Sequence, residues 1–444
     1  SRGLPASAIY AALLVTAQET FEGEIDEDEI RRIADWYDGV EGPDLVQMQQ
    51  AETAAAAAPR IWTSGRSAVL PAAQDASKEL GPRFEHGSEV EFSEAILSQL
   101  EGSGERLRHD AGRMFGYDPG RGIWTEVSSD LGWSAVRGLD RELVPDKVTA
   151  TNPAGLKRLK VSQALCEHVW TMAQSMRASP DFFDSAPPGV AFRNGFADLT
   201  RGLLPHSPDH RARHALAFDL DPNAECPRWD AALASWLAPL EHDAAATAEL
   251  LAEWIGAALF GVATRYERAL LLLGSVANNG KSQFVDVVSA LFPETSLGST
   301  PPQLMDDPNS RAELFGVRLN VVSEMPADDI LRSEGFKSYI TGDRVRARAV
   351  YQEGFTYRPQ AGHLFAANRP PVVSDTTFGF WRRWLVVPFL STYLPGQAGF
   401  VPKLAEHIIA EELPGVARWA VEGIVRLTQR GRFEIPVVMR EAVE

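Results

Sequence analysis

The sequence predicts an α/β protein: a P-loop core built on a parallel sheet, preceded by an α+β domain. Two observations lead to this fold class. The segments "ALLLLG", "RLNVVSE", "GHLFAAN" and "WLVVPF" are short aliphatic runs with little polar alternation, which is typical of parallel strands that helices cover on both faces. The first run also leads through "NNGKS" into a helix-like pattern, and this is the order of a phosphate-binding loop.

Changes in pattern along the 444 residues divide the chain into five segments. The segment "SEAILSQLE" predicts a helix, and turn-rich stretches such as "MFGYDPGRGIW" predict short antiparallel strands nearby. "WDAALASWLAPL" and "TAELLAEWIGAALF" then return to helical periodicity. The predicted segments are an acidic helical segment and linker (1–82), an α+β domain (83–228), a helical connector (229–268), the P-loop core (269–392) and a C-terminal helical segment (393–444).

Charge is distributed unevenly along the chain. The 43 basic and 60 acidic side chains give a net charge of −17, which by itself argues against binding a nucleic-acid backbone. Residues 1–100 hold 7 basic and 18 acidic side chains, whereas residues 301–400 hold 11 basic and 10 acidic ones. The later region can therefore present a basic surface.

Composition also bears on the compartment. No run approaches the roughly 18 apolar residues of a membrane span, and the first residues lack the layout of a signal peptide. We therefore expect an intracellular, cytoplasmic protein without a membrane partner; if a phage or plasmid encodes it, the compartment is that of a bacterial host. Cys166 and Cys226 form neither a disulfide framework nor a metal pair, so we expect two inert, buried thiols.

The phosphate loop supplies the first candidate site. Lysine at position 281 is placed to reach terminal phosphates, serine at 282 to coordinate Mg²⁺, and glycine at 280 lets the backbone approach the ligand. The spacing is irregular, because the expected first glycine falls on Ser275 and not on Gly274. The loop must therefore contain either one extra residue or a serine in place of the first glycine. The candidate nucleotide-binding residues are Ser275, Asn278, Asn279, Gly280, Lys281, Ser282 and Gln283.

Polar residues follow two other predicted strands. Glu324 ends "RLNVVSE", where a carboxylate would hold Mg²⁺ together with Ser282 and polarise the attacking water. Only one acid stands there, unless Asp328 or Asp329 folds back. Asn368 ends "GHLFAAN", where an amide would hydrogen-bond the γ-phosphate and the water.

The motifs occur in the order "ANNGKS", "VVSEM", "FKSYITGDRVRARAVYQEGFTYRP", "HLFAANRPP" and "GFWRRWLVVPF". This order resembles that of the superfamily 3 helicases, specifically the phage and plasmid primase-helicases of the P4 type and the related poxvirus D5 group. Upstream, "GRGIWTEVSSD", "AFRNGFADLTRGLLPHSPDH" and "LDPNAECPRWDAAL" resemble the D5 N-terminal-like domain that precedes such cores. The resemblance covers about residues 83–435.

The resemblance implies a modified AAA+ fold, hexameric rings, and ATP-driven translocation from 3′ to 5′ on single-stranded DNA during phage or plasmid DNA replication. Carried over by motif position, Lys281 and Ser282 end the Walker A motif, Glu324 is the Walker B acid and Asn368 is the sensor. The implied cofactors are ATP and Mg²⁺. The implied partners are single-stranded DNA at a replication fork and five further copies of the chain.

Two arginines, Arg382 and Arg383, stand directly before the last predicted strand. A guanidinium group offered to a neighbouring subunit's γ-phosphate stabilises the transition state and makes hydrolysis depend on assembly. The resemblance implies that Arg383 is this arginine finger, with Arg382 as the alternative. The other interpretation is that both merely flank a strand.

Superfamily 3 helicases carry a DNA-contacting β-hairpin between the Walker B acid and the sensor. Here "RVRARAV" predicts a strand with one basic face that can follow phosphates, while an interleaved tyrosine, 351 or 357, stacks on a base. A solvated strand face is the alternative, and Arg348 can instead be structural or serve a neighbour's nucleotide. The candidate DNA-binding residues are Lys337, Arg344, Arg346, Arg348 and Tyr351, with Arg358 nearby.

Two departures from the family pattern bear on function. No primase domain with metal-binding acids is evident upstream, and the chain ends soon after "RGRFEIPVVMREAVE", where relatives often continue into a winged-helix domain. We therefore expect a primase or origin-binding domain to come from regions beyond this chain or from another chain.

Two rival functions stay open. One is a P-loop scaffold or nucleotide-gated ring that binds partners without unwinding DNA; the other is a non-catalytic remnant, as the irregular loop and single acid suggest. A metal site at His206, His210 and His214 is disfavoured, because Pro208 interrupts the helix that would align them, and we expect a surface loop there.

Overall fold

The computed structural model describes residues 83–102, 106–276, 278–325, 333–350, 354–373, 377–396 and 399–442. All of them belong to one compact unit, Ala73–Glu444. The predicted acidic segment 1–82 lies outside the described residues, as do Asp328, Asp329 and Tyr351.

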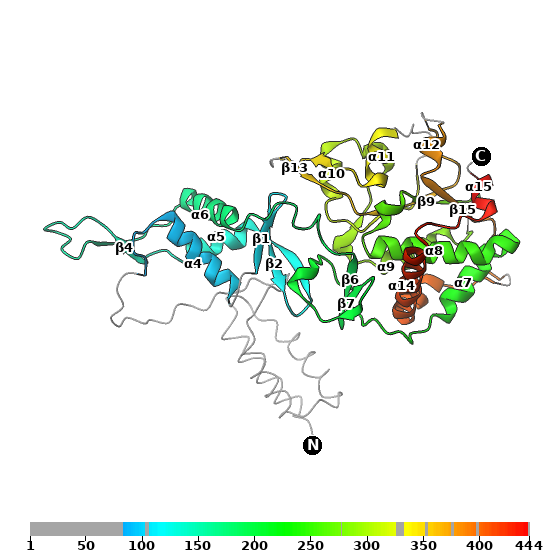
Figure 1. Cartoon of the computed structure of the whole chain (residues 1–444), viewed down its shortest axis with the longest axis horizontal. Helices are drawn as coiled ribbons and strands as arrows, with labels where there is room; N and C mark the ends of the chain where they lie inside the picture. Colours follow the sequence, from blue (N-terminus) through cyan, green and yellow to red (C-terminus); the bar gives the residue numbers. More distant parts are fainter. Residues whose placement is uncertain are drawn as a thin grey trace, which may run out of the picture. The chain divides into compact units, whose positions relative to one another are not determined.

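The α+β region, residues 83–226, mixes helices with small antiparallel sheets, as predicted (Figure 1). Its helices begin at serine caps: the Ser88 hydroxyl accepts the Glu91 N–H while the Glu91 carboxylate accepts the Ser88 N–H. The helices are α4 (Glu89–Glu101), α5 (Ser129–Arg137) and α6 (Gln163–Met176). The strands are β1 (Leu107–Asp110), β2 (Arg113–Asp118) and β3 (Ile123–Val127), then β4 (Leu143–Pro145) and β5 (Leu156–Arg158), then β6 (Gly189–Phe192), β7 (Gly195–Asp198) and β8 (Gly202–Leu204).

A helical layer joins this region to the core. It consists of α7 (Pro227–Leu237), α8 (Ala244–Leu259), α13 (Leu404–Glu411), α14 (Leu413–Arg430) and α15 (Val437–Glu441). Helices α8 and α14 approach closely because glycines lie at their crossing: a Cβ on Gly423 would overlap the Ala252 backbone, and one on Gly256 would overlap the Ala420 carbonyl. The buried Glu253 carboxylate on α8 pairs with Arg430 of α14.

The core contains a five-stranded parallel sheet in the order β10-β11-β14-β9-β15. The strands are β10 (Leu297–Gly298), β11 (Leu319–Val322), β14 (Gly362–Ala367), β9 (Ala269–Leu273) and β15 (Trp384–Pro388). The four aliphatic runs of the sequence are thus four parallel strands, which confirms the predicted fold class. Strand β10 was not predicted, because two half-buried residues carry no periodicity.

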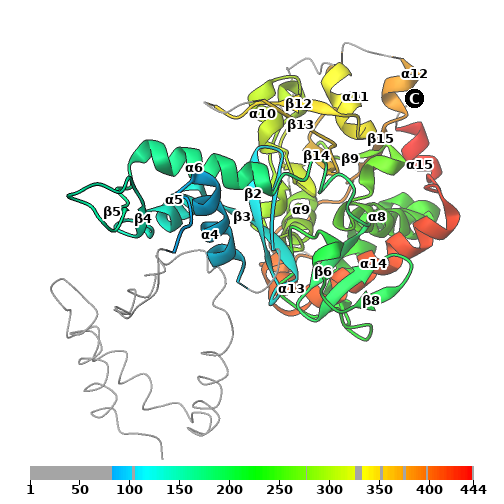
Figure 2. The same ribbon diagram turned by 60° about the vertical axis from the view of Figure 1, so that its left-hand side comes forward.

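The remaining core elements surround this sheet. They are α9 (Lys281–Ala290), α10 (Pro308–Glu313), α11 (Ser333–Thr341), α12 (Phe378–Trp381) and the antiparallel hairpin β12 (Val345–Ala347) and β13 (Phe355–Tyr357). Short 3-10 turns connect them: η1 (Pro208–His210), η2 (Ala238–Asp243), η3 (Ala263–Tyr266), η4 (Glu294–Ser296) and η5 (Pro302–Leu304). Figure 2 shows α11 and the hairpin on one side of β9 and β14, and α8 and α14 on the other.

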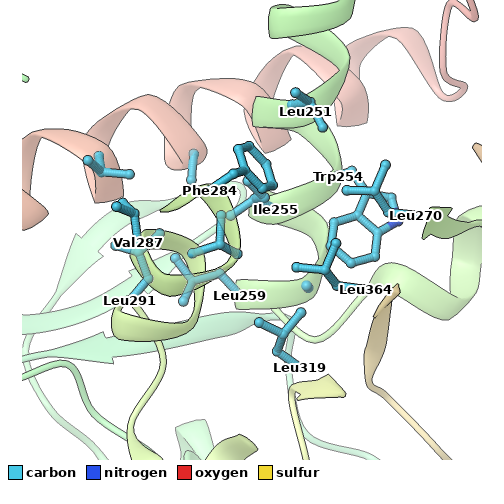
Figure 3. Packing of buried hydrophobic residues seen from close by; sticks show 14 of the residues in the cluster. Leu251, Trp254, Ile255, Leu259, Leu270, Phe284, Val287, Leu291, Leu319 and Leu364 are labelled. Carbon is cyan, nitrogen blue, oxygen red and sulfur yellow. The ribbon is translucent and has the colours of Figure 1, made fainter. Parts of the chain in front are cut away.

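Apolar side chains cover both faces of the sheet, which explains the uninterrupted strand sequences. On one face, Leu270, Leu319 and Leu364 of β9, β11 and β14 pack against side chains of α8 and α9, including Trp254 and Phe284 (Figure 3). Burying a side chain of this size stabilises the fold by about 1.5–3 kcal/mol. On the other face, α11 and the hairpin form a second apolar cluster. With both faces covered, the exposed polar residues Glu324 and Asn368 follow the strand ends.

Candidate nucleotide site and DNA interface

Three loops that follow parallel strands meet at one edge of the sheet. The phosphate loop follows β9, Asn368 follows β14 and Glu324 lies two residues beyond β11. The register pairs Leu273 with Ala367, so the first two loops leave the sheet side by side. The carboxyl ends of adjacent parallel strands are where α/β proteins place ligands.

Lys281 is the most informative residue of this edge. Its side chain is 8% exposed, and its Nζ donates to the Gly274 carbonyl oxygen at 2.6 Å and to Asn368 Oδ1 at 3.2 Å. Burial lowers the pKa of Lys281. Both partners are neutral oxygens, and no carboxylate in the described part of the chain lies within ion-pair distance of it. An anion at this edge would supply the missing counter-charge.

The loop resolves the irregular spacing of its motif. A Cβ on Gly274 would overlap the Asn279 side chain and lie 2.5 Å from the Phe389 carbonyl oxygen, so only glycine fits there. Gly274 therefore takes the place of the first glycine. The segment 275–279 absorbs one extra residue, with Asn278 at a positive φ of 55°.

Some of the predicted nucleotide-binding residues are exposed, whereas others form hydrogen bonds within the protein. Ser275, Asn278 and Ser282 are exposed. Asn279 is buried, and its Nδ2 donates to the Phe389 carbonyl oxygen at 3.4 Å, which shapes the loop. Gln283 accepts the Ala405 N–H at 2.8 Å and so holds the start of α13.

Two features require glycine at position 280: its positive φ and the close approach of the Trp236 side chain. Gly280 has φ of 93°, and a Cβ there would lie 2.5 Å from the Trp236 ring of α7. The indole thus packs directly against the turn that begins α9.

Ser282 and Glu324 are the residues that could hold a metal ion. Both side chains are exposed, one at the first turn of α9 and the other beyond β11. A hydroxyl and a carboxylate are oxygen ligands, the type that Mg²⁺ prefers when phosphate oxygens complete its shell. This donor set fits the expected ion.

A cavity of about 590 Å³ adjoins the phosphate loop. Sequence reasoning missed it, because its walls come from α7, the loop and the segment after β15. Tyr393 joins two of these walls, since its N–H donates to the Asn278 carbonyl oxygen at 2.8 Å and its hydroxyl lies 2.9 Å from Ser235 Oγ. Aromatic residues 236, 393 and 400 line it. The volume is in the range of small-molecule sites.

Arg382 and Arg383 lie at the opposite edge of the sheet. The Arg383 carbonyl oxygen accepts the Ala269 N–H at 2.8 Å, at the start of β9. The five residues of β9 at about 3.3 Å each separate this edge from the phosphate loop by roughly 17 Å. Neither arginine reaches Lys281 of its own chain.

The two arginines differ in availability. The Arg383 guanidinium donates through Nη1 to the Gly379 carbonyl oxygen, and its Nε is buried. Arg382 is about half exposed, with side-chain exposure of 48%, and its Nη2 lies 3.8 Å from the Glu267 carboxylate. Arg382 is therefore the more exposed of the two side chains.

The hairpin has the predicted basic face. Val345 and Ala347 are buried, whereas Arg344, Arg346 and Arg348 are exposed. Lys337 lies half-buried on α11.

Base stacking by the tyrosine at position 357 was a wrong expectation. Its ring is 2% exposed, and its hydroxyl lies 3.1 Å from the Tyr339 hydroxyl and donates to the Arg311 carbonyl oxygen. Burial of this side chain in the apolar cluster leaves no face for a base.

One basic residue of the hairpin is tied to the α+β region. Arg344 forms ion pairs with Asp181 and with Asp184, the latter at 3.4 Å. Asp184 also accepts the Arg358 N–H at 3.2 Å. The predicted DNA contact at Arg344 thus already has two acidic partners.

Three further expectations concern residues away from this edge of the sheet. Both cysteines are buried and free of disulfides, as expected. His210 stacks on Phe196 and is buried, so the expectation of a surface loop was wrong at this residue. No helix in the described ranges has the length and apolarity of a membrane span.

Two family models match the chain. Residues 100–237 match a family described as D5 N terminal like, and residues 272–383 match a family of unknown function (DUF5906). Among curated proteins, "Putative helicase L207/L206" of Acanthamoeba polyphaga mimivirus is 27% identical over 145 residues. That match covers 30% of this chain and spans 14% of the length of the viral protein.

Solved structures of the NrS-1 C-terminal region also align with the chain. An A-form apo structure has a TM-score of 0.37 at 13% identity, covering 65% of this chain and 68% of that chain. Another apo structure has a TM-score of 0.39 at 12% identity, covering 70% and 74%.

The parallel sheet and the loop at Lys281 define an α/β protein of the P-loop class. The D5 N terminal like match precedes this core, and a relative bears a helicase name. The match over residues 100–237 confirms the part of the motif resemblance that concerns the D5 N-terminal-like domain.

Proposed function

We propose that this chain is the ATP-hydrolysing motor of a DNA helicase that acts in phage or plasmid DNA replication. The observation that carries the proposal is the buried ammonium of Lys281, which in the described part of the chain donates to two neutral oxygens, the Gly274 carbonyl and the Asn368 amide, at the carboxyl edge of the sheet. A buried cation between neutral oxygens is completed by an anionic ligand, and a triphosphate on the loop places its β- and γ-phosphates there.

Residues around Lys281 would bind the other parts of the nucleotide and its metal ion. Ser282 and Glu324 would hold Mg²⁺, Glu324 would also polarise the attacking water, and Asn368 would position it. The adjacent cavity, with the Trp236 and Tyr393 rings in its lining, would take the nucleoside. Mg²⁺ supplies charge neutralisation of the phosphates when bound.

Completion of the site would require a second subunit. Arg382 and Arg383 lie a strand length away from Lys281 of the same chain, so an arginine finger must come from a neighbour. We propose that Arg382 is the finger, because Arg383 is bound back to Gly379. A ring of six copies, acting from 3′ to 5′, is the assembly in which each interface would contain one such site.

The basic face of β12 would contact the DNA strand. Arg346 lies at its centre, between the buried residues Val345 and Ala347, so its side chain must point away from the core. Backbone phosphates are the matching partner for such a row of arginines.

The test is strand displacement with ATP and Mg²⁺ on matched duplexes that carry only a 3′ or only a 5′ tail. We expect unwinding from the 3′ tail, and its loss together with ATP turnover in Lys281→Ala. Lys157→Ala, which removes an exposed lysine of the α+β region, is the control and should unwind normally.

Two outcomes would contradict parts of the proposal. ATP turnover retained by Lys281→Ala would remove the phosphate-loop assignment. Rings that hydrolyse ATP but displace neither duplex, with or without added single-stranded DNA, would favour a nucleotide-gated scaffold.

A further inference from the structure

Two arginines meet where the α+β region joins the core. Arg213 lies three residues beyond η1, and Arg318 lies directly before β11. The segments are connected here, since His214 Nε2 donates to the Gly316 carbonyl oxygen at 2.8 Å. Neither arginine belongs to the nucleotide site or to the hairpin.

Each of the two guanidinium groups lies against a glycine, whose missing side chain leaves space for it. A Cβ on Gly316 would overlap the Arg213 guanidinium, and a Cβ on Gly261 would overlap that of Arg318. Both glycines have a positive φ, 79° and 69°. Two separate turns are therefore shaped around these two cations.

Aromatic rings surround the Arg213 guanidinium. Its Cζ lies 4.3 Å from the ring centre of Phe315, 5.0 Å from that of Phe183 and 5.1 Å from that of Phe115. Rings satisfy the planar faces of a guanidinium but do not accept its five N–H groups, which lie in its plane.

Among the residues that the structure describes, neither Arg213 nor Arg318 has a hydrogen-bond acceptor or a carboxylate within ion-pair distance. Asp184 is nearby, but its carboxylate already binds Arg344 and the Arg358 N–H. Burial and the neighbouring positive charges of Arg113 and Arg318 lower the pKa of Arg213 to about 10. The carboxylates of Glu126 and Asp110 act in the opposite direction on the pKa of Arg213, but neither forms an ion pair with it, so the two like charges share the junction without a direct ionic partner.

Two small cavities adjoin this pair. One has a volume of about 20 Å³ and the other about 10 Å³, and Arg213, His214 and Arg318 line both. A volume of roughly 10–15 Å³ on this scale holds one water-sized particle. The larger cavity has room for a monoatomic anion.

We propose that Arg213 and Arg318 together bind one chloride ion, which joins the α+β region to the β11 side of the core. Chloride accepts N–H groups from both guanidiniums at once and neutralises their repulsion. Neutral His214 beside them adds no competing charge, because burial and the two arginines lower its pKa to about 3. This site is independent of the helicase proposal.

The test is thermal unfolding of the full chain in sodium chloride against sodium gluconate at constant ionic strength. We expect chloride to raise Tm saturably by about 2–4 °C. Arg318→Met should abolish this increment, whereas Arg193→Met, at an exposed arginine paired with Asp219, should retain it. A wild-type Tm that is equal in the two salts, or an increment that Arg318→Met retains, would overturn the proposal.

Two further measurements keep the test decisive. A saturable rise of equal size in sodium sulfate would overturn a monoatomic site in favour of an oxyanion site. If Arg318→Met does not fold, chloride NMR on the wild type decides: line broadening that bromide displaces supports the site, and an unbroadened line excludes it.

Discussion

At the scale of single residues, the sheet contains a polar pair that is fully buried. Asn320 of β11 and His363 of β14 are directly opposite each other, and both are 0% exposed. Asn320 binds both backbone groups of Thr300 at 2.8 Å, and its Nδ2 lies 3.2 Å from His363 Nδ1. Burial lowers the pKa of His363 to about 3, so the folded protein keeps this ring neutral.

This histidine makes stability depend on pH. Below about pH 6.5 the unfolded chain protonates His363 and the folded chain does not, so the free energy of unfolding falls as pH drops from 6.5 toward 3. Urea unfolding at pH 7.5 and 5.5 should show that His363→Phe loses less stability between these pH values than the wild type does, by roughly 1 kcal/mol. An identical loss in both proteins would show that the ring is protonated in the fold.

At the scale of elements, the α8–α14 crossing depends on residues without side chains. Gly423→Val places methyl groups where the Ala252 backbone lies, so the helices must separate. We expect a loss of about 1–3 kcal/mol in denaturant unfolding. Gln429→Val, an exposed position on the same helix, should change stability by less than about 0.5 kcal/mol. Equal effects of the two variants would mean that the crossing is not tightly packed.

The hairpin is the element that we assign to DNA. Removing one phosphate contact lowers the slope of log affinity against log salt by about 1. Arg346→Ala should therefore weaken single-strand binding and flatten this slope, as measured by fluorescence anisotropy. Arg141→Ala, an arginine with 83% side-chain exposure in the α+β region, is the matched control. An unchanged slope in Arg346→Ala would exclude the contact.

At the scale of the whole molecule, the two halves of the proposed catalytic site lie on opposite edges of one sheet. This arrangement predicts complementation between subunits. Arg382→Ala should lower ATP turnover by roughly tenfold or more, and mixing it with Lys281→Ala should restore part of the activity. Some mixed interfaces then pair an intact lysine with an intact arginine.

A coupled ATPase assay across mixing ratios measures this recovery. Arg383→Ala in the same assay identifies the finger. If only Arg383→Ala lowers turnover, the choice of Arg382 is wrong, and if no mixture recovers activity the site does not span two subunits.

By itself the sequence determined the parallel core, the loop at Lys281, the acid and amide that follow β11 and β14, and the basic face of β12. These features are local, because strand burial, loop spacing and alternation are all visible within about ten consecutive residues. The α+β region was predictable for the same reason, since its turns and strands are short and sequential.

Tertiary structure alone decided the rest. That Gly274 replaces Ser275 as the first glycine depends on Phe389, more than a hundred residues away. The cavity beside the loop, the ion pair of Arg344 with Asp181 and the meeting of Arg213 with Arg318 likewise join distant segments. A sequence shows which side chains are available, but burial and partners depend on which segments the sheet brings together.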